Sequence, residues 1–208
     1  MRTTPYPVDE KFLLEQLKVL GAYQVDMEKI TNTRGVSPAL MAGVMSRESA
    51  CGLALKPMGP TGTGDFKERE PKLSVGRTGR TPPDGGGFGR GLMQIDYDWH
   101  GFARMGEWRN PHDNIDYSAK MIRSSWNIFL TKWAGLTPEF ALRCALASYN
   151  CGYAAVCKAM LETTNTAGIR PNPDKYTTGG DYSVDVLFRV QWFEQNGLTT
   201  YSQRPYPR

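Results

Sequence analysis

The chain has 208 residues, of which 40% are hydrophobic and 22% are charged, and its formal net charge is +4. This length and balance fit a globular protein with a substantial core and exclude a chain that is disordered throughout. No apolar run is long enough to span a membrane, so we expect no membrane insertion. The mild positive charge suits an anionic polymer, but no nucleic-acid-binding motif accompanies it, and we expect no nucleic-acid partner.

The first predicted element is a long helix over residues 8–31, followed by a break at Gly35. The seven residues before it, Met-Arg-Thr-Thr-Pro-Tyr-Pro, lack the apolar core of a secretory signal. The prediction of the helix depends on apolar residues that recur at helical spacing: Phe12, Leu13, Leu17, Leu20 and Tyr23.

A second helix begins at Ser37 and Pro38, because a hydroxyl caps free N–H groups and proline suits the first helical position. We expect it to end at Gly52. Glu48 shares the face of this helix that carries the apolar residues, so its carboxyl group must find a partner or raise its pKa. Two interpretations stay open: a salt bridge to Arg47 or another arginine, or a general acid.

Residues 53–88 are rich in glycine, proline, threonine and charges, with almost no apolar periodicity. So long a stretch predicts a functional flap or a disordered excursion rather than a separate domain. The following stretch, residues 84–96, predicts a short hairpin or sheet around Phe88, Leu92 and Ile95. It lacks the Gly-Lys-Ser/Thr ending of a phosphate-binding loop, which argues against nucleotide binding.

The second half of the chain predicts four more helices, over residues 114–133, 138–149, 153–162 and 182–197. Thr137 and Asp181 precede two of them as expected caps, and a loose tail follows at residues 198–208. The helix over residues 114–133 carries an apolar stripe that includes Leu130, and the apolar stripe of the helix over residues 182–197 includes Val184. We therefore expect one α+β, mainly α domain over residues 1–208, with a small β element in its middle.

The four cysteines, Cys51, Cys144, Cys151 and Cys157, leave two alternatives open. They are buried free thiols, or at least one disulfide joins two of the last three. Their spacing is not that of a zinc site, and the chain has only two histidines, so we expect no metal and no cofactor.

Four stretches occur in the order found in a known family. Ser46-Arg-Glu-Ser49, Gly91-Leu-Met-Gln-Ile-Asp96 and Ala147-Ser-Tyr-Asn-Cys-Gly152 resemble the goose-type lysozymes and the related soluble lytic transglycosylases. Asp181-Tyr-Ser-Val-Asp-Val186 resembles the goose-type lysozymes more narrowly. The resemblance implies a lysozyme-like helical domain with a small sheet beside a cleft, and an enzyme that cuts the β-1,4 bond between N-acetylmuramic acid and N-acetylglucosamine.

Carried over residue by residue, the resemblance implies that Glu48 is the catalytic acid and that Asp96 positions the attacking water. A second water-positioning carboxylate is matched by Asp84, although an extra residue in the glycine-rich turn shifts its register. Asp65 and Glu68 remain alternatives for that role, and Asp96 has the alternative role of a cap. An inverting mechanism needs the acid and the opposite carboxylate roughly 6.5–9.5 Å apart.

The same resemblance implies a substrate-lining pair, Tyr149 and Asn150, a tyrosine near the acid, Tyr182, and a histidine at the cleft, His100. Gln94 and Asn150 carry amides that suit an N-acetyl group, and Tyr149 offers a flat face to a sugar ring. Packing for Tyr149 and a surface position for His100 are the structural alternatives.

The sequence therefore predicts an inverting muramidase that acts as a monomer on peptidoglycan glycan strands, and on chito-oligosaccharides, and lyses bacterial walls. We expect it to act at the wall as a secreted, periplasmic or phage-released antimicrobial protein. A lytic transglycosylase that forms 1,6-anhydro products and a wall-binding module without activity are the alternatives.

Overall fold

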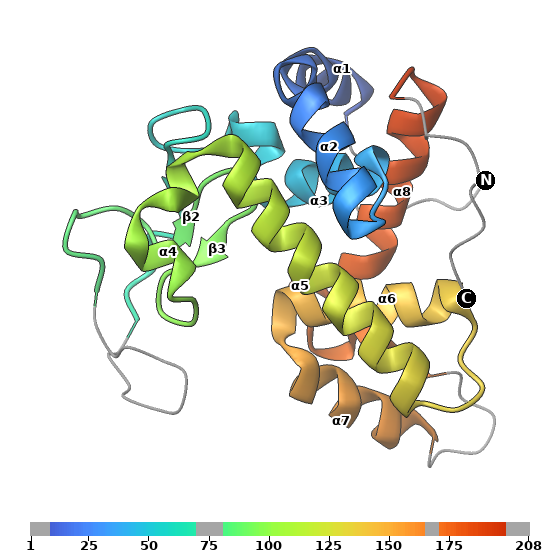
Figure 1. Ribbon diagram of the computed structural model, residues 1–208. Coiled ribbons are helices and arrows are strands. Elements are labelled where there is room, and N and C mark those ends of the chain that lie inside the picture. Colours follow the sequence, from blue (N-terminus) through green and yellow to red (C-terminus); the bar gives the residue numbers. More distant parts are fainter. Residues whose placement is uncertain (1–8, 70–80, 165–170, 199–208) are drawn as a thin grey trace.

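The computed structural model describes residues 9–69, 81–164 and 171–198. Within these residues there are eight α-helices and a small three-stranded antiparallel sheet, which lies at the left of the view in Figure 1, and this confirms the mainly α, α+β class. No helix in this part of the chain is long and apolar enough to cross a membrane.

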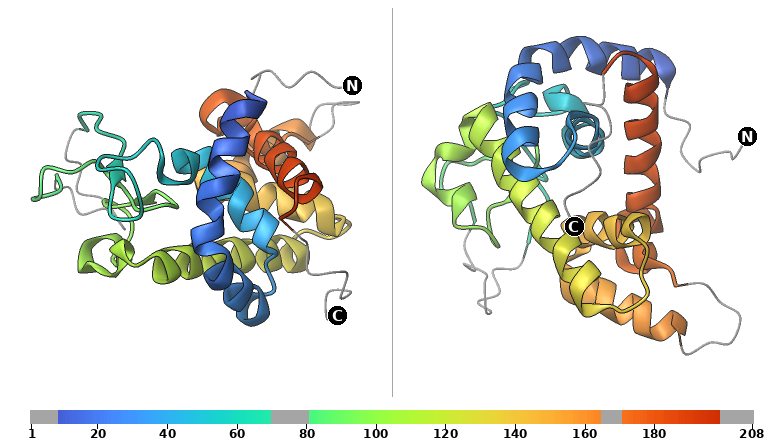
Figure 2. Two further views of the ribbon diagram at one scale, coloured as in Figure 1. Left: turned by 90° about the horizontal axis from the view of Figure 1, so that it is seen from above. Right: turned by 45° about the vertical axis from the view of Figure 1, so that its right-hand side comes forward.

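The N-terminal stretch forms two helices, α1 (Glu10–Leu20) and α2 (Gln24–Arg34), joined by one 3-10 turn at Gly21–Tyr23. The prediction of a single helix was wrong, because glycine is a poor helix former and the turn redirects the chain. The right-hand view of Figure 2 shows α1 across the top of the molecule, with α2 and α8 descending on either side. The bend lets both helices bury their apolar residues against one core. The predicted break at Gly35 is confirmed by its left-handed φ of 65°.

Helix α3 (Pro38–Ser49) lies at the centre of the molecule, and its residues 38–46 are all buried. It begins as predicted, since the Ser37 hydroxyl accepts a hydrogen bond from the Leu40 N–H. It ends three residues earlier than predicted, because Ala50 and Cys51 adopt positive φ angles of 49° and 57°.

The sheet consists of β1 (Thr63–Gly64), β2 (Gly89–Arg90) and β3 (Ile95–Asp96), in that spatial order. Residues 84–96 thus form the predicted hairpin, with Arg90 paired to Ile95. Strand β1 falls within residues 53–88, so part of that segment is regular structure that the sequence did not reveal. Its residues 70–80, and with them much of the predicted flap, lie outside the described residues.

The remaining helices are α4 (Phe102–Met105), α5 (Pro111–Lys132), α6 (Pro138–Cys151), α7 (Tyr153–Thr164) and α8 (Tyr182–Gln195). Four of them match the predicted helices within three residues at their starts, and α4 was not predicted.

Local details of these helices confirm one expected cap, contradict the other, and correct the expected burial of two residues. Thr137 caps α6 as expected, accepting a hydrogen bond from the Phe140 N–H. Asp181 precedes α8 but its side chain makes no cap hydrogen bond and pairs with Arg47 instead. Leu130 and Val184, which were expected to face the core, are 39% and 44% exposed.

Two hydrophobic clusters form the core. The larger joins α1, α2, α3, α5 and α8 to the hairpin, where Leu92, Met93 and Ile95 are buried. The smaller joins α5, α6 and α7 around Phe129 and Met160. All four cysteines are free thiols, so the disulfide alternative is not realised. Because the larger cluster packs the hairpin against α3, it fixes the distance between the sheet and the end of the helix that carries Glu48.

Candidate active site

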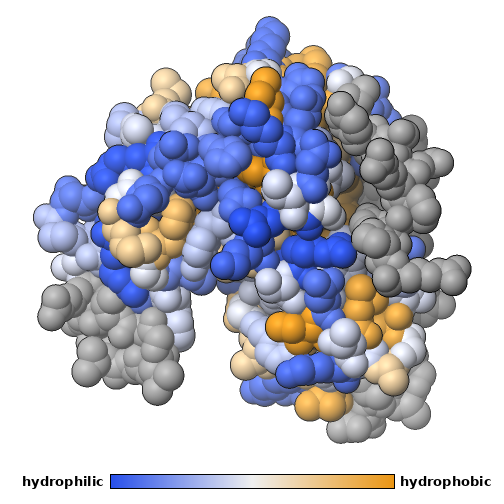
Figure 3. All heavy atoms as spheres, viewed as in Figure 1, coloured by the Kyte–Doolittle hydropathy of each residue, from blue (hydrophilic) through white to orange (hydrophobic). Residues whose placement is uncertain are grey.

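A pocket of about 400 Å³ opens between the sheet and the helices α3, α5 and α6. The face shown in Figure 3 is indented between the part that holds the sheet and the part that holds α6 and α7, and hydrophilic residues predominate around the indentation. All but two of the site residues predicted from the sequence line this pocket: Glu48, Gln94, Asp96, His100, Tyr149 and Asn150.

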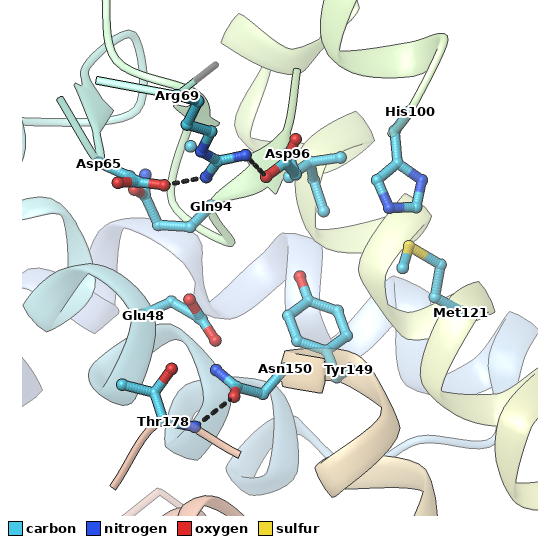
Figure 4. Close-up of a pocket in the computed structure, with 12 residues that line it drawn as sticks. Glu48, Asp65, Arg69, Gln94, Asp96, His100, Met121, Tyr149, Asn150 and Thr178 are labelled. Atoms are coloured by element: carbon cyan, nitrogen blue, oxygen red, sulfur yellow. Dashed lines mark hydrogen bonds and ion pairs between the residues drawn. The ribbon is translucent and has the colours of Figure 1, made fainter. Parts of the chain in front are cut away.

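Glu48 lies in the last turn of α3 and points into the pocket from one wall (Figure 4). Burial raises the pKa of Glu48 to about 7, although the hydrogen bond from Tyr182 and the charge of Arg47 both oppose that rise. Among the described residues Glu48 forms no ion pair, and Arg47 instead binds Asp185 at 2.9 Å. The salt-bridge interpretation of Glu48 is therefore wrong, and its carboxyl group has the pKa of a general acid near neutral pH.

Tyr182 does not line the pocket but lies directly behind Glu48. It is the first residue of α8, its side chain is 1% exposed, and its hydroxyl donates a hydrogen bond to Glu48 Oε1. Arg47 holds the start of α8 in place by binding Asp181 and Asp185, which flank Tyr182. Burial, followed by the nearby Glu48 charge, raises the pKa of Tyr182 well above its usual value, so it remains a donor.

Asp96 and Asp65 lie on the opposite wall, across the pocket from Glu48 (Figure 4). Asp96 ends β3, and its Oδ1 accepts hydrogen bonds from the backbone N–H groups of Asp98 and Trp99 at 2.8 and 3.3 Å. Asp96 therefore caps a turn rather than a helix, and it also lines the pocket. Asp65 directly follows β1, and strand pairing brings it to the hairpin that carries Asp96.

Asp84 is placed elsewhere. Its two carboxylate oxygens accept hydrogen bonds of 2.7 and 2.9 Å from Arg90, and Arg109 lies 3.5 Å away. These hydrogen bonds lower the pKa of Asp84 to about 2. Arg90 is almost fully buried, so Asp84 neutralises a buried cation. Asp84 does not line the pocket. Of the two alternatives for its role, Asp65 lines the pocket, whereas Glu68 is exposed outside it.

Two of the remaining predicted residues use a polar atom in a contact with the protein. The Tyr149 hydroxyl donates to the Met93 carbonyl at 2.7 Å, which leaves mainly the ring for a ligand. His100 Nδ1 contacts the Tyr117 hydroxyl at 3.1 Å, and burial lowers the pKa of His100. Both residues line the pocket, so the surface position considered for His100 is not realised.

The two amide side chains keep one end available. Gln94 donates to the Gly91 carbonyl at 2.8 Å, and Asn150 Oδ1 accepts from the Thr178 N–H at the same distance. In Figure 4 the Asn150 amide nitrogen lies on the side of Glu48. Among the residues that the structure describes, Gln94 keeps a free acceptor and Asn150 a free donor, which is the pair that an N-acetyl group requires.

Sequence reasoning missed one charged residue of the pocket, Arg69, which binds both Asp65 and Asp96. Its only local signal is its position four residues after Asp65, and that spacing indicates contact only within a helix. Among the described residues, no group of three or more histidine, cysteine, aspartate or glutamate side chains is placed to hold a metal ion.

The chain is similar to known proteins over most of its length. Residues 75–197 match the family model described as "Lysozyme g". The chain is 29% identical to "Lysozyme G" of Dromaius novaehollandiae over 87% of its length and 70% of the relative's. It is 28% identical to "Lysozyme g" of Struthio camelus, over 90% and 73% of the two chains. It is 30% identical to that of Takifugu rubripes, over 77% and 68%.

Proposed function

Because the chain belongs to the lysozyme g family and is therefore a lysozyme-type glycoside hydrolase that cleaves peptidoglycan, we propose that it is an inverting muramidase. The bond cut is the β-1,4 link between N-acetylmuramic acid and N-acetylglucosamine. The observation that carries the proposal is the carboxyl group of Glu48, with a pKa of about 7, opposite two aspartates across an open pocket.

Glu48 is the general acid. At a pKa of about 7 a substantial fraction of its carboxyl groups is protonated at neutral pH. Tyr182 donates to Oε1, so the acidic proton resides on Oε2 and is delivered from there to the glycosidic oxygen. The leaving sugar then departs as a neutral alcohol.

The attacking water is held on the other side of the sugar ring by Asp96 and Asp65. Their position across the pocket from Glu48 supports a single displacement, in which water enters opposite the leaving group. Asp65 takes the role that the sequence analysis gave to Asp84, because Asp84 is bound to Arg90 outside the pocket.

The sugar is positioned by the side chains around the acid. Asn150 donates to the carbonyl of an N-acetyl group and Gln94 accepts from its N–H, while the Tyr149 ring packs against a sugar face. His100 lies farther along the same wall, beside Asp96 and Met121 (Figure 4), where it contacts a neighbouring sugar. Chito-oligosaccharides carry the same N-acetyl groups and are therefore substrates as well.

The substitution Glu48→Gln tests the acid. We expect it to lower the rate of wall lysis by at least about 100-fold with an unchanged melting temperature, since general acid catalysis typically contributes 10²–10⁴. The matched control is Glu139→Gln, an exposed glutamate in the first turn of α6, which should lyse walls at the wild-type rate. Near wild-type lysis by Glu48→Gln would contradict the assignment.

The products decide the reaction type. Hydrolysis gives reducing muramic acid ends that initially have the α configuration, which proton NMR detects during the first turnovers. Products lighter by one water, the 1,6-anhydro form, would indicate a transglycosylase, and an initial β configuration would contradict inversion. Sugar binding without products would indicate a binding module.

A further inference from the structure

We propose that Arg69 is a positioning residue of the reaction, which holds Asp65 and Asp96 together as one water-binding pair. This inference rests on the proposed function, because it assigns the two aspartates to the attacking water. It concerns a residue that the sequence motifs do not include.

The geometry is that of a bridge. Arg69 Nη1 lies 2.5 Å from Asp96 Oδ2, while Nη2 donates to Asp65 Oδ2, so one guanidinium binds one oxygen of each carboxylate (Figure 4). The carbon of the same guanidinium lies 4.2 Å from the centre of the Phe88 ring. Stacking on a ring while donating in its own plane is a geometry that arginine offers and lysine does not. The bridge therefore fixes both the position and the orientation of the two carboxylates.

The charges around the bridge explain why a cation is needed there. Glu48 faces it from α3, Asp65 follows β1, and Asp96 ends β3. Burial lowers the pKa of His100, and Arg104 binds the backbone carbonyls of Tyr97 and Asp98. Tyr149, from α6, is uncharged because burial raises its pKa.

Without Arg69, two carboxylates would share one partly buried pocket. Like charges at close range raise the pKa of one member of the pair, and that member then carries a proton. A protonated aspartate accepts water less well and cannot take its proton. Asp96 Oδ1 is already occupied by two backbone N–H groups, so Oδ2, the oxygen that Arg69 binds, is where this proton would go.

The charge of Arg69 itself is secure. Burial alone would lower the pKa of Arg69, but the hydrogen bonds and charges of Asp96 and Asp65 raise it above its usual value. The guanidinium is thus a permanent cation over the whole pH range in which Glu48 titrates. Its positive charge therefore faces the carboxylates of Asp65 and Asp96 at every pH at which Glu48 titrates.

The test is the pH dependence of kcat/KM for cleavage of purified glycan strands by the wild type and by Arg69→Ala and Arg69→Lys. The acidic limb of the profile follows the pKa of the water-binding pair, which must be ionised. We expect Arg69→Ala to move this limb to higher pH by about one unit or more, a roughly tenfold loss of rate on that limb. Arg69→Lys keeps the charge, so its acidic limb should return most of the way to the wild-type position.

Arg109→Ala is the matched control. It removes one cation that pairs with an aspartate, Asp84, outside the pocket. We expect its acidic limb to coincide with that of the wild type, which separates the bridge from general attraction between a basic protein and an anionic substrate.

Two outcomes would overturn the proposal. An equal loss of rate at every pH, with the limb in place, would assign Arg69 a merely structural role. A higher cleavage rate for Arg69→Ala than for the wild type would mean that the bridge blocks the site. The variant Glu48→Gln separates these outcomes from failure of the proposed function. If Glu48→Gln is inactive but the acidic limb of Arg69→Ala stays at its wild-type pH, only the inference about Arg69 is wrong.

Discussion

At the scale of single residues, the site depends on the balance of forces on Glu48. Burial raises the pKa of this carboxyl group, and the Tyr182 hydroxyl and the Arg47 charge lower it, with a result of about 7. Asp84, which is exposed and bound by Arg90, lies at the other extreme with a pKa of about 2. Two carboxyl groups of the same protein thus differ in proton affinity because of what surrounds them.

Tyr182→Phe should shift the alkaline limb of kcat/KM to higher pH. The hydrogen bond from Tyr182 lowers the pKa of Glu48, so its loss lets burial raise that pKa further, and the acid stays protonated to higher pH. The rate at the optimum should fall, because the proton of Glu48 is no longer restricted to Oε2. The pH profile measured on glycan strands checks this, and an alkaline limb that moves down or stays in place would contradict it.

At the scale of elements, the contact of α3 with α8 builds the acid side of the site. Glu48 lies on α3 and Tyr182 on α8, and the two helices approach closely at Gly43. A Cβ atom at Gly43 would lie 2.5 Å from a methyl carbon of Val190 and 3.0 Å from the carbonyl oxygen of Val186. The glycine therefore sets the spacing that lets Tyr182 reach Glu48.

Gly43→Ala should lower the free energy of unfolding by about 1–3 kcal/mol, because overpacking at a tight helix contact forces the elements apart. In a chain of this size the melting temperature falls by roughly 2–4 °C per kcal/mol. The control is Gly21→Ala, since a Cβ there meets nothing within 4 Å. Equal melting temperatures for the two variants would show that the α3–α8 contact tolerates the added methyl group.

The sheet builds the wall of the pocket that lies opposite Glu48. Each strand has only two residues, yet the pairing of β1 with β2 and of β2 with β3 carries Asp65 to Asp96. The hairpin is anchored by Leu92 and Met93 in the main core. Asp84 contributes here as a structural residue, since it neutralises Arg90 within β2.

At the scale of the whole molecule, we propose that residues 1–208 form one catalytic domain that acts as a monomer on the cell wall. Its net charge of +4 favours adsorption to an anionic wall, and this attraction is screened within about 8 Å at physiological ionic strength.

Lysis of intact walls should therefore slow as salt is raised, whereas cleavage of short soluble glycan fragments should change much less. The two rates are compared over the same salt series, with turbidity for walls and product analysis for fragments. Equal salt dependence for both substrates would place the effect in the pocket and contradict adsorption by net charge.

The sequence by itself determined the features that depend on near neighbours. Ser37 with Pro38, and Thr137 with Pro138, start helices because capping and proline geometry act within one turn. The four motifs identified the family and singled out Glu48, and the apolar pattern predicted the core helices.

Only the tertiary structure decided which charges meet. Asp65, Arg69 and Asp96 come together because strands pair and bring loops side by side, and no pattern along residues 53–88 encodes that contact. Asp84 leaves the site for the same reason, since its partner Arg90 is buried by the fold. Charges are placed by long-range pairing, whereas helices begin and end by local chemistry.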